Sequence, residues 1–189
     1  MSNLKNLYFN NNYNTDKYNL GYFDLFYEDI FFSLKNRPIN LLEIGVFGGG
    51  SIKLWKDYLH EDSKICAADI NLCNEIENLK NVRHIVCDAY NQSNLHNFED
   101  NHYDLIIDDG PHTYQSFEFL VENYHSKLKD NGTMIIEDII DLSWTSKLIS
   151  LAKKTGYVNI KHINAAGKQK TEHLLSLWTK GLDVLILKK

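Results

Sequence analysis

Apolar and polar residues follow one another along the chain in two alternating patterns. Short, nearly continuous apolar runs predict strands that are buried on both faces. The clearest such runs lie before the glycines at 45–50 and at 105–107, and strands are expected over residues 40–44, 64–69, 82–87, 103–108, 133–137, 157–163 and 183–187. Between many of them, apolar residues recur every three or four positions, which predicts amphipathic helices over 51–58, 112–128 and 143–155. This alternation is typical of an α/β domain with a doubly wound, mostly parallel sheet and right-handed crossovers.

The N-terminal part of the chain has a different pattern. Residues 1–14 are rich in asparagine and tyrosine and show no period, so we expect a loose arm or a partner-binding segment. From Asp16, apolar residues between Tyr22 and Leu34 recur at spacings of three and four, which predicts one helix that ends before Pro38. We therefore expect a single domain of 189 residues, with an N-terminal helical cap over 15–37 and a core over 40–189.

A glycine-rich turn separates the first core strand from the first core helix. The strand ends in Glu43 and Ile44, the turn contains Gly45, Gly48 and Gly49, and the helix follows. Glycines let backbone amides approach a ligand closely, and the start of a helix adds unpaired N–H groups. The spacing G-x-x-G-G-G differs from the G-x-G-x-x-G of dinucleotide sites, so the turn favours another nucleotide-type cofactor. An ordinary tight turn without a ligand is the alternative.

Acidic residues also follow the next two strands. Asp69 ends the second strand, where one carboxylate can accept hydrogen bonds from both hydroxyls of a ribose. Asp69 is equally compatible with a cap on the segment that follows it. Asp88 and Ala89 close the third strand.

Two further strands end in pairs of acids. Asp108 and Asp109 follow the fourth strand together with His112, and Glu137 and Asp138 follow the fifth. Because the carboxyl ends of parallel strands meet at one edge of a sheet, we expect these groups to converge. Converging carboxylates repel one another, and a hard divalent cation such as Mg²⁺ would relieve the repulsion. Each acid alone is also explained as a helix cap or as part of a turn.

Composition narrows the class of protein. The formal charge is −5 and the pI is about 5.9, so we expect no nucleic-acid partner. No apolar run is long enough to span a membrane, and the first residues lack the apolar segment of a signal peptide, which favours a cytoplasmic enzyme. The three cysteines have neither a metal-binding nor a disulfide spacing. The sequence leaves a homo-oligomer open.

Taken together, these motifs resemble class I S-adenosylmethionine-dependent methyltransferases, from about residue 41 to the C-terminus. The resemblance implies a seven-stranded, Rossmann-like sheet whose last two strands form an antiparallel hairpin, with the final strand inserted. It also implies S-adenosylmethionine as cofactor, with its methionyl part at the glycine turn, its ribose at Asp69 and its adenine beside Asp88. Glu43 would orient the glycine turn or the cofactor amine. The expected cofactor-binding residues are Glu43, Gly45, Phe47, Gly48, Gly49, Ser51, Asp69, Asp88, Ala89, Asp108 and Lys17.

The acidic strand ends resemble the metal-dependent sugar O-methyltransferases of macrolide pathways, the mycinamicin and macrocin type, and their cephalosporin hydroxylase-like relatives. The resemblance rests on Asp-Asp-Gly-Pro-His-Thr at 108–113 and Ile-Glu-Asp at 136–138. It implies that Asp109, Glu137 and Asp138 bind Mg²⁺ or another hard divalent cation. It also implies that His112 is the general base, with Asp109 as the second catalytic residue.

The activity implied by the resemblance is transfer of a methyl group to a hydroxyl of a small-molecule or glycan acceptor. Thr15-Asp16-Lys17 resembles the T-D-K opening of the family, whereas Tyr22 lies where histidines are expected, which leaves its role open. The lysines at 168 and 170 either contact phosphates of a nucleotide-linked sugar or simply face solvent.

Three alternative functions remain at this point. They are an NAD- or nucleotide-sugar-binding oxidoreductase, a non-catalytic partner subunit, and a methyltransferase for catechol-like molecules. The oxidoreductase would need a Tyr-x-x-x-Lys pair or another hydride-transfer site, but Tyr124 is followed by Leu128 at that spacing. The doubled acids at two strand ends argue against a degenerate, non-catalytic subunit.

Overall fold

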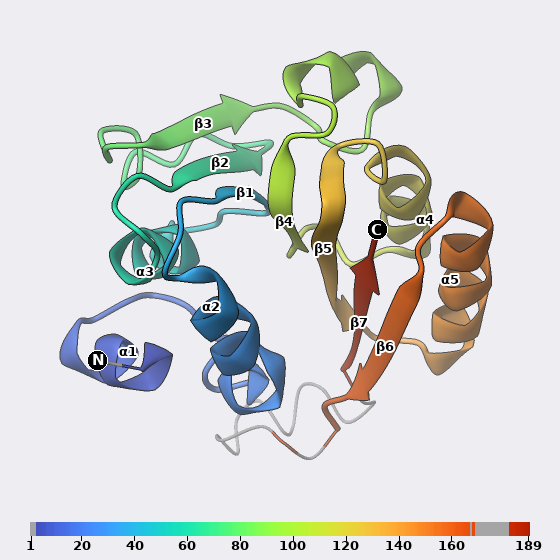
Figure 1. Cartoon of the computed structure of the whole chain (residues 1–189), viewed down its shortest axis with the longest axis horizontal. Coiled ribbons are helices and arrows are strands. Elements are labelled where there is room, and N and C mark those ends of the chain that lie inside the picture. The colour runs from blue at the N-terminus through green and yellow to red at the C-terminus, as the bar shows by residue number, and fades with distance from the viewer. Residues whose placement is uncertain (1–2, 167, 169–181) are drawn as a thin grey trace.

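A seven-stranded sheet forms the centre of the protein (Figure 1). The computed structural model describes residues 3–166, 168 and 182–189. The strands are β1 (Asn40–Ile44), β2 (Lys64–Asp69), β3 (Val82–Val86), β4 (Tyr103–Asp108), β5 (Leu128–Ile139), β6 (Asn159–Asn164) and β7 (Asp183–Lys188). Their order is β3-β2-β1-β4-β5-β7-β6, with β7 antiparallel to both neighbours and the other pairs parallel. The expected mostly parallel sheet with an inserted final strand is confirmed.

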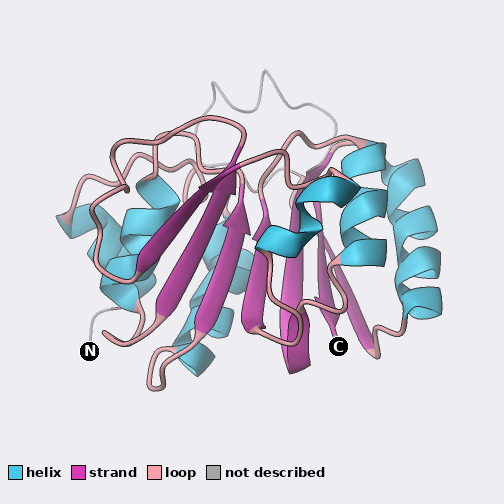
Figure 2. Ribbon diagram, turned by 90° about the horizontal axis from the view of Figure 1, so that it is seen from above, coloured by secondary structure: helices cyan, strands magenta, loops and turns pink. Residues whose placement is uncertain are grey.

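Helices cover both faces of this sheet (Figure 2). One face carries α1 (Leu4–Asn10), the π-helix η1 (Phe23–Tyr27), α2 (Glu28–Leu34) and α3 (Gly50–Tyr58), and the other carries α4 (Tyr114–Asn123) and α5 (Leu142–Thr155). A 3₁₀-helix, η2 (Gln92–Asn97), follows β3. Each face of the sheet has its own hydrophobic core. Along β1, Leu41 packs into the core on the side of α1, α2 and α3, and Leu42 and Ile44 pack into the core on the side of α4 and α5, since successive side chains of a strand point to opposite faces. Burial on both faces explains the continuous apolar runs in the sequence.

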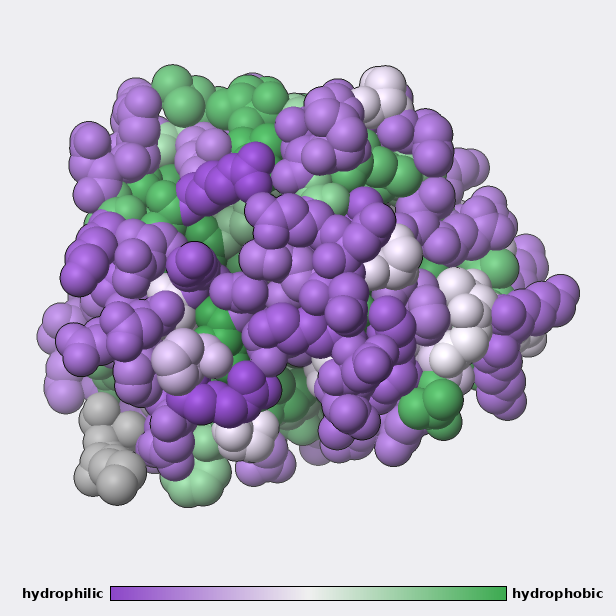
Figure 3. All heavy atoms as spheres, turned by 45° about the horizontal axis from the view of Figure 1, so that its top comes forward, coloured by the Kyte–Doolittle hydropathy of each residue, from purple (hydrophilic) through white to green (hydrophobic). Residues whose placement is uncertain are grey.

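The surface differs sharply from these two cores. Hydrophilic side chains dominate the face shown in Figure 3, and apolar side chains appear there in separate groups. Within the described part of the chain, no helix combines the length and the apolar character needed to cross a bilayer.

A buried acid, Asp104, fixes the amino-terminal edge of the sheet. Its carboxylate accepts a hydrogen bond from the backbone N–H of Asn40 (2.9 Å) and forms ion pairs with Arg37 (2.8 Å) and Lys129 (2.7 Å). Burial alone would raise the pKa of this carboxyl, but the hydrogen bonds from Asn40, Lys129 and Arg37 hold it below its usual value. These contacts tie the start of β1 to β4 and β5, which helps to keep the opposite strand ends in register.

The N-terminal segment is more ordered than the sequence pattern predicts. In place of the loose arm expected over 1–14, α1 buries Leu4 completely, and the Leu4 N–H donates to the Glu28 carboxylate (2.8 Å). The helix expected from 16 to 37 is also divided, because Gly21 adopts a left-handed conformation (φ +83°) and helical structure begins only at Phe23. The first difference arises from tertiary packing: the Tyr8 ring of α1 lies 5.5 Å from the Phe23 ring, edge to face.

Other boundaries differ from the predicted ones by a few residues. The helix α4 begins at Tyr114 rather than at His112, because Thr113 caps it and forms a capping box with Ser116. His112 therefore lies in the loop that leads from β4 into α4. Lys170 lies outside the described residues, as does most of the stretch that precedes β7, whereas Lys168 is described and exposed.

The contacts of Asp104 yield a prediction about stability. We expect Asp104→Ala to lower the free energy of unfolding by about 1.5 to 3 kcal/mol, because the charged acceptor of the Asn40 N–H and of two cations is lost. Urea denaturation measures this change. The exposed Asp130 is a matched control, and Asp130→Ala should change the stability by less than about 0.5 kcal/mol. Equal stabilities of the two variants would show that Asp104 does not fix this edge.

Candidate active site

The carboxyl ends of β1, β2, β4 and β5, with the residues directly after them, meet at one edge of the sheet. Ile44 is in register with both Ala68 and Asp108, and Asp108 is in register with Ile136. The glycine turn, Asp69 and the two acidic pairs are therefore neighbours in space, as the sequence predicts for parallel strand ends.

The glycine turn is packed against other loops of the chain. Gly45 has φ +91°, and a Cβ there would lie 1.9 Å from the backbone oxygen of Asp109. A Cβ on Gly50 would lie equally close to the backbone oxygen of Asn14. At Gly48 the contact is looser, because such an atom would meet only the side-chain nitrogen of Asn14, at 3.1 Å. The glycines thus allow the N-terminal segment and the loop after β4 to approach the turn closely.

Asp69 holds this turn in shape from the end of β2. Its Oδ2 accepts hydrogen bonds from the N–H groups of Val46 (2.7 Å) and Phe47 (3.2 Å), and its Oδ1 accepts one from Asn71 (2.8 Å). The capping role considered for Asp69 is therefore present. Two solvent-exposed apolar residues lie near Asp69: Phe47 is 90% exposed and Ile70 is 69% exposed. They provide an apolar surface beside the carboxylate.

Glu43 is fully buried beneath the glycine turn. Its carboxylate accepts hydrogen bonds from the Ser51 hydroxyl (2.6 Å) and the Trp55 indole N–H (2.5 Å). Burial raises the pKa of Glu43 to about 7. Of the two roles expected for Glu43, orientation of the turn agrees with these contacts, because Ser51 and Trp55 both lie on α3. The side chains of Glu43 and Ser51 are engaged with each other.

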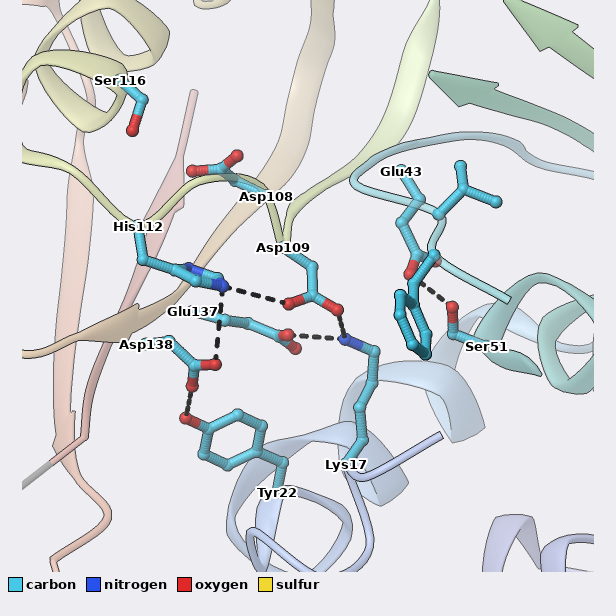
Figure 4. A network of polar contacts seen from close by, with 12 residues as sticks. Lys17, Tyr22, Glu43, Ser51, Asp108, Asp109, His112, Ser116, Glu137 and Asp138 are labelled. Carbon is cyan, nitrogen blue, oxygen red and sulfur yellow. Dashed lines mark hydrogen bonds and ion pairs between the residues drawn. The ribbon is translucent and has the colours of Figure 1, made fainter. Parts of the chain in front are cut away.

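One acid of each pair, Asp109 and Glu137, contacts a buried lysine (Figure 4). The Lys17 ammonium lies 2.7 Å from Asp109 Oδ2 and 2.6 Å from Glu137 Oε2, and the Lys17 side chain is 1% exposed. Burial alone would lower the pKa of Lys17, but the Asp109 and Glu137 carboxylates hold it well above its usual value. The ammonium is therefore charged at neutral pH, and it neutralises part of the acidic cluster.

Two tyrosines of the N-terminal cap complete the cluster. The Tyr27 hydroxyl donates a hydrogen bond to Glu137 Oε1, and the Tyr22 hydroxyl donates one to Asp138 Oδ1. Glu137 thus has a cap residue on each oxygen, Lys17 on one and Tyr27 on the other. The sequence left the role of Tyr22 open, and the structure brings it onto the second acid of the pair.

His112 lies between Asp109 and Asp138. Its Nε2 is 3.6 Å from Asp109 Oδ1 and 3.8 Å from Asp138 Oδ2. Both His112 (φ +53°) and Asp138 (φ +56°) have left-handed backbone conformations, which are uncommon for residues other than glycine and often occur at functional sites. Burial, followed by the repulsion of Asp109, raises the pKa of Asp138 to about 6.

The donor atoms here suit a hard metal ion. One ligand atom each from Asp109, His112 and Asp138 lies within 4.8 Å of the others. The two carboxylate oxygens at this spacing suit a hard divalent cation, and the imidazole nitrogen lies beside them. Glu137, the third ligand expected from the sequence, faces Lys17 and Tyr27 instead of this group.

The remaining expected residues lie on the β3 and β4 side of the site. Asp108 is fully buried; one of its oxygens accepts a hydrogen bond from the Tyr90 hydroxyl, and the other has no partner among the described residues. Burial raises the pKa of Asp108 to about 7. Asp88 is exposed and caps the N–H of Tyr90 (2.9 Å), and Ala89 is buried.

Sequence reasoning missed two residues of the site. Tyr90 follows Asp88-Ala89 directly, so its position near the cofactor motifs was the available signal. Asn14, which contacts the glycine turn, had no signal, because nothing in the first residues indicates that they fold back over the sheet edge.

Comparison with known proteins agrees with this geometry. The sequence matches the family described as "Methyltransferase domain" over residues 42–139. Among solved structures, MycE methyltransferase from the mycinamycin biosynthetic pathway, in complex with Mg and SAH, has a TM-score of 0.66 and 19% identity over 100% of this chain and 54% of its own. None of the curated proteins matches the chain.

Other solved structures share the fold but differ in their described roles. The Methanococcus jannaschii fibrillarin pre-rRNA processing protein has a TM-score of 0.61 and 16% identity over 80% of this chain and 66% of its own. The Haemonchus contortus phosphoethanolamine N-methyltransferase 2, in complex with S-adenosyl-L-methionine, has a TM-score of 0.59 and 16% identity over 100% of this chain and 60% of its own. This chain therefore spans only about half to two thirds of these proteins, and such identities show the fold alone.

The family match bears on one of the alternatives left by the sequence, the oxidoreductase. It covers more than half of the chain and includes the glycine turn, Asp69, and both acidic pairs. An oxidoreductase on a similar sheet is not supported by it. The chain belongs to the methyltransferase-domain family and has the class I fold of S-adenosylmethionine-dependent methyltransferases.

Proposed function

We propose that this protein is a metal-dependent O-methyltransferase that transfers a methyl group from S-adenosylmethionine to a hydroxyl of a sugar or glycoside. The observation that carries the proposal is the convergence of Asp109, His112 and Asp138 beside the glycine turn. The likeness of the fold to MycE, whose crystals contain Mg and SAH, supports it. The acceptor class covers nucleotide-linked sugars, polysaccharides and natural-product glycans.

The cofactor would bind along the glycine turn and the end of β2. Bound there, S-adenosylmethionine supplies a methyl group on a positively charged sulfur. Gly45, Gly48 and Gly49 would face its methionyl part, and the Asp69 carboxylate would accept hydrogen bonds from the ribose hydroxyls. The exposed Phe47 would cover the adenine side, together with Ile70, Asp88 and Ala89. The unpartnered oxygen of Asp108 is a further acceptor in this part of the site.

The remaining predicted cofactor-binding residues would affect the cofactor indirectly, without contacting it. Glu43 and Ser51 hydrogen-bond to each other and so shape the turn and the start of α3. Lys17 is buried against acids rather than turned toward the turn. These three residues would influence cofactor binding through the position of the loop.

A divalent cation would be held by Asp109 and Asp138, with Glu137 as the third carboxylate. Bound there, it would stabilise negative charge on the acceptor hydroxyl. Asp109 would serve both the cation and the orientation of His112, since its Oδ1 faces the imidazole.

His112 would act as the general base. Its Nε2 would take the proton from the acceptor hydroxyl while that oxygen bonds to the methyl carbon and the carbon–sulfur bond breaks. The carboxylates of Asp109 and Asp138 on either side of Nε2 would then stabilise the imidazolium that forms. The left-handed loop at His112 keeps the ring outside α4 and turned toward these acids.

A methyl-transfer assay with labelled S-adenosylmethionine tests the proposed function. Glycosides, nucleotide sugars and catechols are offered as acceptors, each with Mg²⁺ and with EDTA. We expect methylation of a sugar hydroxyl that EDTA abolishes, and loss of at least about 10²-fold in Asp109→Asn because a charged ligand of the cation is lost. Asp130→Asn, at an exposed site, should retain full activity. Turnover that is unaffected by EDTA, or methylation only at nitrogen or carbon, would contradict the proposal.

Replacement of the proposed base gives a second prediction. His112→Ala should lower turnover by roughly 10² to 10⁴, the usual contribution of a positioned base, with little change in cofactor affinity. His96, exposed on η2, is the control, and His96→Ala should behave as wild type. A His112→Ala variant with more than about a third of wild-type turnover at every pH would assign proton removal elsewhere.

A further inference from the structure

Lys17 occupies the space that a metal ion would need between two of its proposed ligands. Its ammonium is within 2.7 Å of both Asp109 Oδ2 and Glu137 Oε2. The second oxygen of Glu137 accepts a hydrogen bond from Tyr27. Both oxygens of Glu137 are therefore engaged by the cap, and a metal that binds Oε2 from the side of Asp109 has to displace the ammonium.

The Lys17 ammonium neutralises part of the charge of the acids without a metal ion. Asp109, Glu137 and Asp138 lie together at the ends of β4 and β5, and each is largely or wholly removed from solvent. In the part of the chain that the structure describes, Lys17 is the one lysine or arginine that forms an ion pair with any of the three. A divalent cation and an ammonium would thus satisfy the same carboxylates, and both at once would crowd like charges on Asp109.

The position of Lys17 is linked to that of the glycine turn. Three residues before it, Asn14 lies against Gly48 and Gly50, and Tyr13 donates a hydrogen bond to Asp57 of α3 (2.6 Å). The segment 13–17 therefore covers the turn that would receive the cofactor. Movement of the lysine away from the acids would move this covering segment.

We propose that Lys17 and the divalent metal alternate in this site, so that metal binding displaces the ammonium and releases segment 13–17 from the glycine turn. The inference rests on the metal-binding part of the proposed function. Lysine binding keeps the acids together before the metal arrives. Metal binding then exposes the turn, which couples occupancy of the metal site to access for the cofactor.

Calorimetric titration of the full chain with Mn²⁺ alone tests the competition. Lys17→Met keeps the length of the side chain without its charge, and it should bind Mn²⁺ about tenfold or more tightly than wild type, within the usual range of coupling between competing ligands. Lys129→Met is the matched control, because it removes a lysine paired with Asp104 at the other edge of the sheet, and its affinity should equal that of wild type. Equal or weaker binding by Lys17→Met overturns the exchange while leaving the metal site intact. Absence of Mn²⁺ binding in all three proteins overturns the metal site and the exchange together.

Hydrogen exchange on the wild-type chain provides a readout that does not depend on the variant. Saturating Mn²⁺ should increase the exchange rate of amides in segment 13–17 if the segment is released. Unchanged or slower exchange, with Mn²⁺ bound, would show that Lys17 only repels the metal without leaving, which overturns the release.

Discussion

The buried ion pairs of Lys17 with Asp109 and Glu137 hold the N-terminal cap against the acidic cluster at the edge of the sheet. A buried ammonium or carboxylate without a partner costs several kcal/mol, so the lysine and the acids need each other. Because Lys17 and the tyrosines at 22 and 27 all belong to the N-terminal cap, the same contacts fix the cap on the edge of the sheet. The site and the cap are therefore one structural unit: removing the charges on either side would loosen both.

The mostly parallel sheet was predictable because burial on both faces leaves a distinctive pattern in the sequence. The strand 103–108 is buried throughout and has the apolar run 105–107 at its centre, and the strand–helix alternation admits few topologies. The inserted final strand came from the family resemblance, not from periodicity. The cap was predicted poorly, since Leu4 is buried and Tyr8 is partly buried by contacts with distant residues. In addition, the left-handed turn at Gly21 interrupts an apparently continuous helical period.

The candidate site was predictable to the extent that strand ends determine it. Parallel strands bring Asp69, Asp109 and Asp138 to one edge, whatever their side chains then contact. The individual partners could not be predicted in this way. Lys17 lies far along the chain from Glu137, and only the folded cap reveals that the lysine faces the acids rather than the glycine turn. The spare oxygen of Asp108 and the contact of Asn14 with Gly48 are likewise products of packing between loops.

We propose that the acids at the carboxyl ends of β4 and β5 form a metal site beside a cofactor-binding turn. Anomalous diffraction from crystals grown with Mn²⁺ and S-adenosylhomocysteine tests it most directly. The account predicts an anomalous peak in contact with the carboxylates of Asp109 and Asp138, and S-adenosylhomocysteine lying along residues 45–49 with its ribose at Asp69. Cofactor bound along the turn with Lys17 still seated and no manganese at these carboxylates would contradict it.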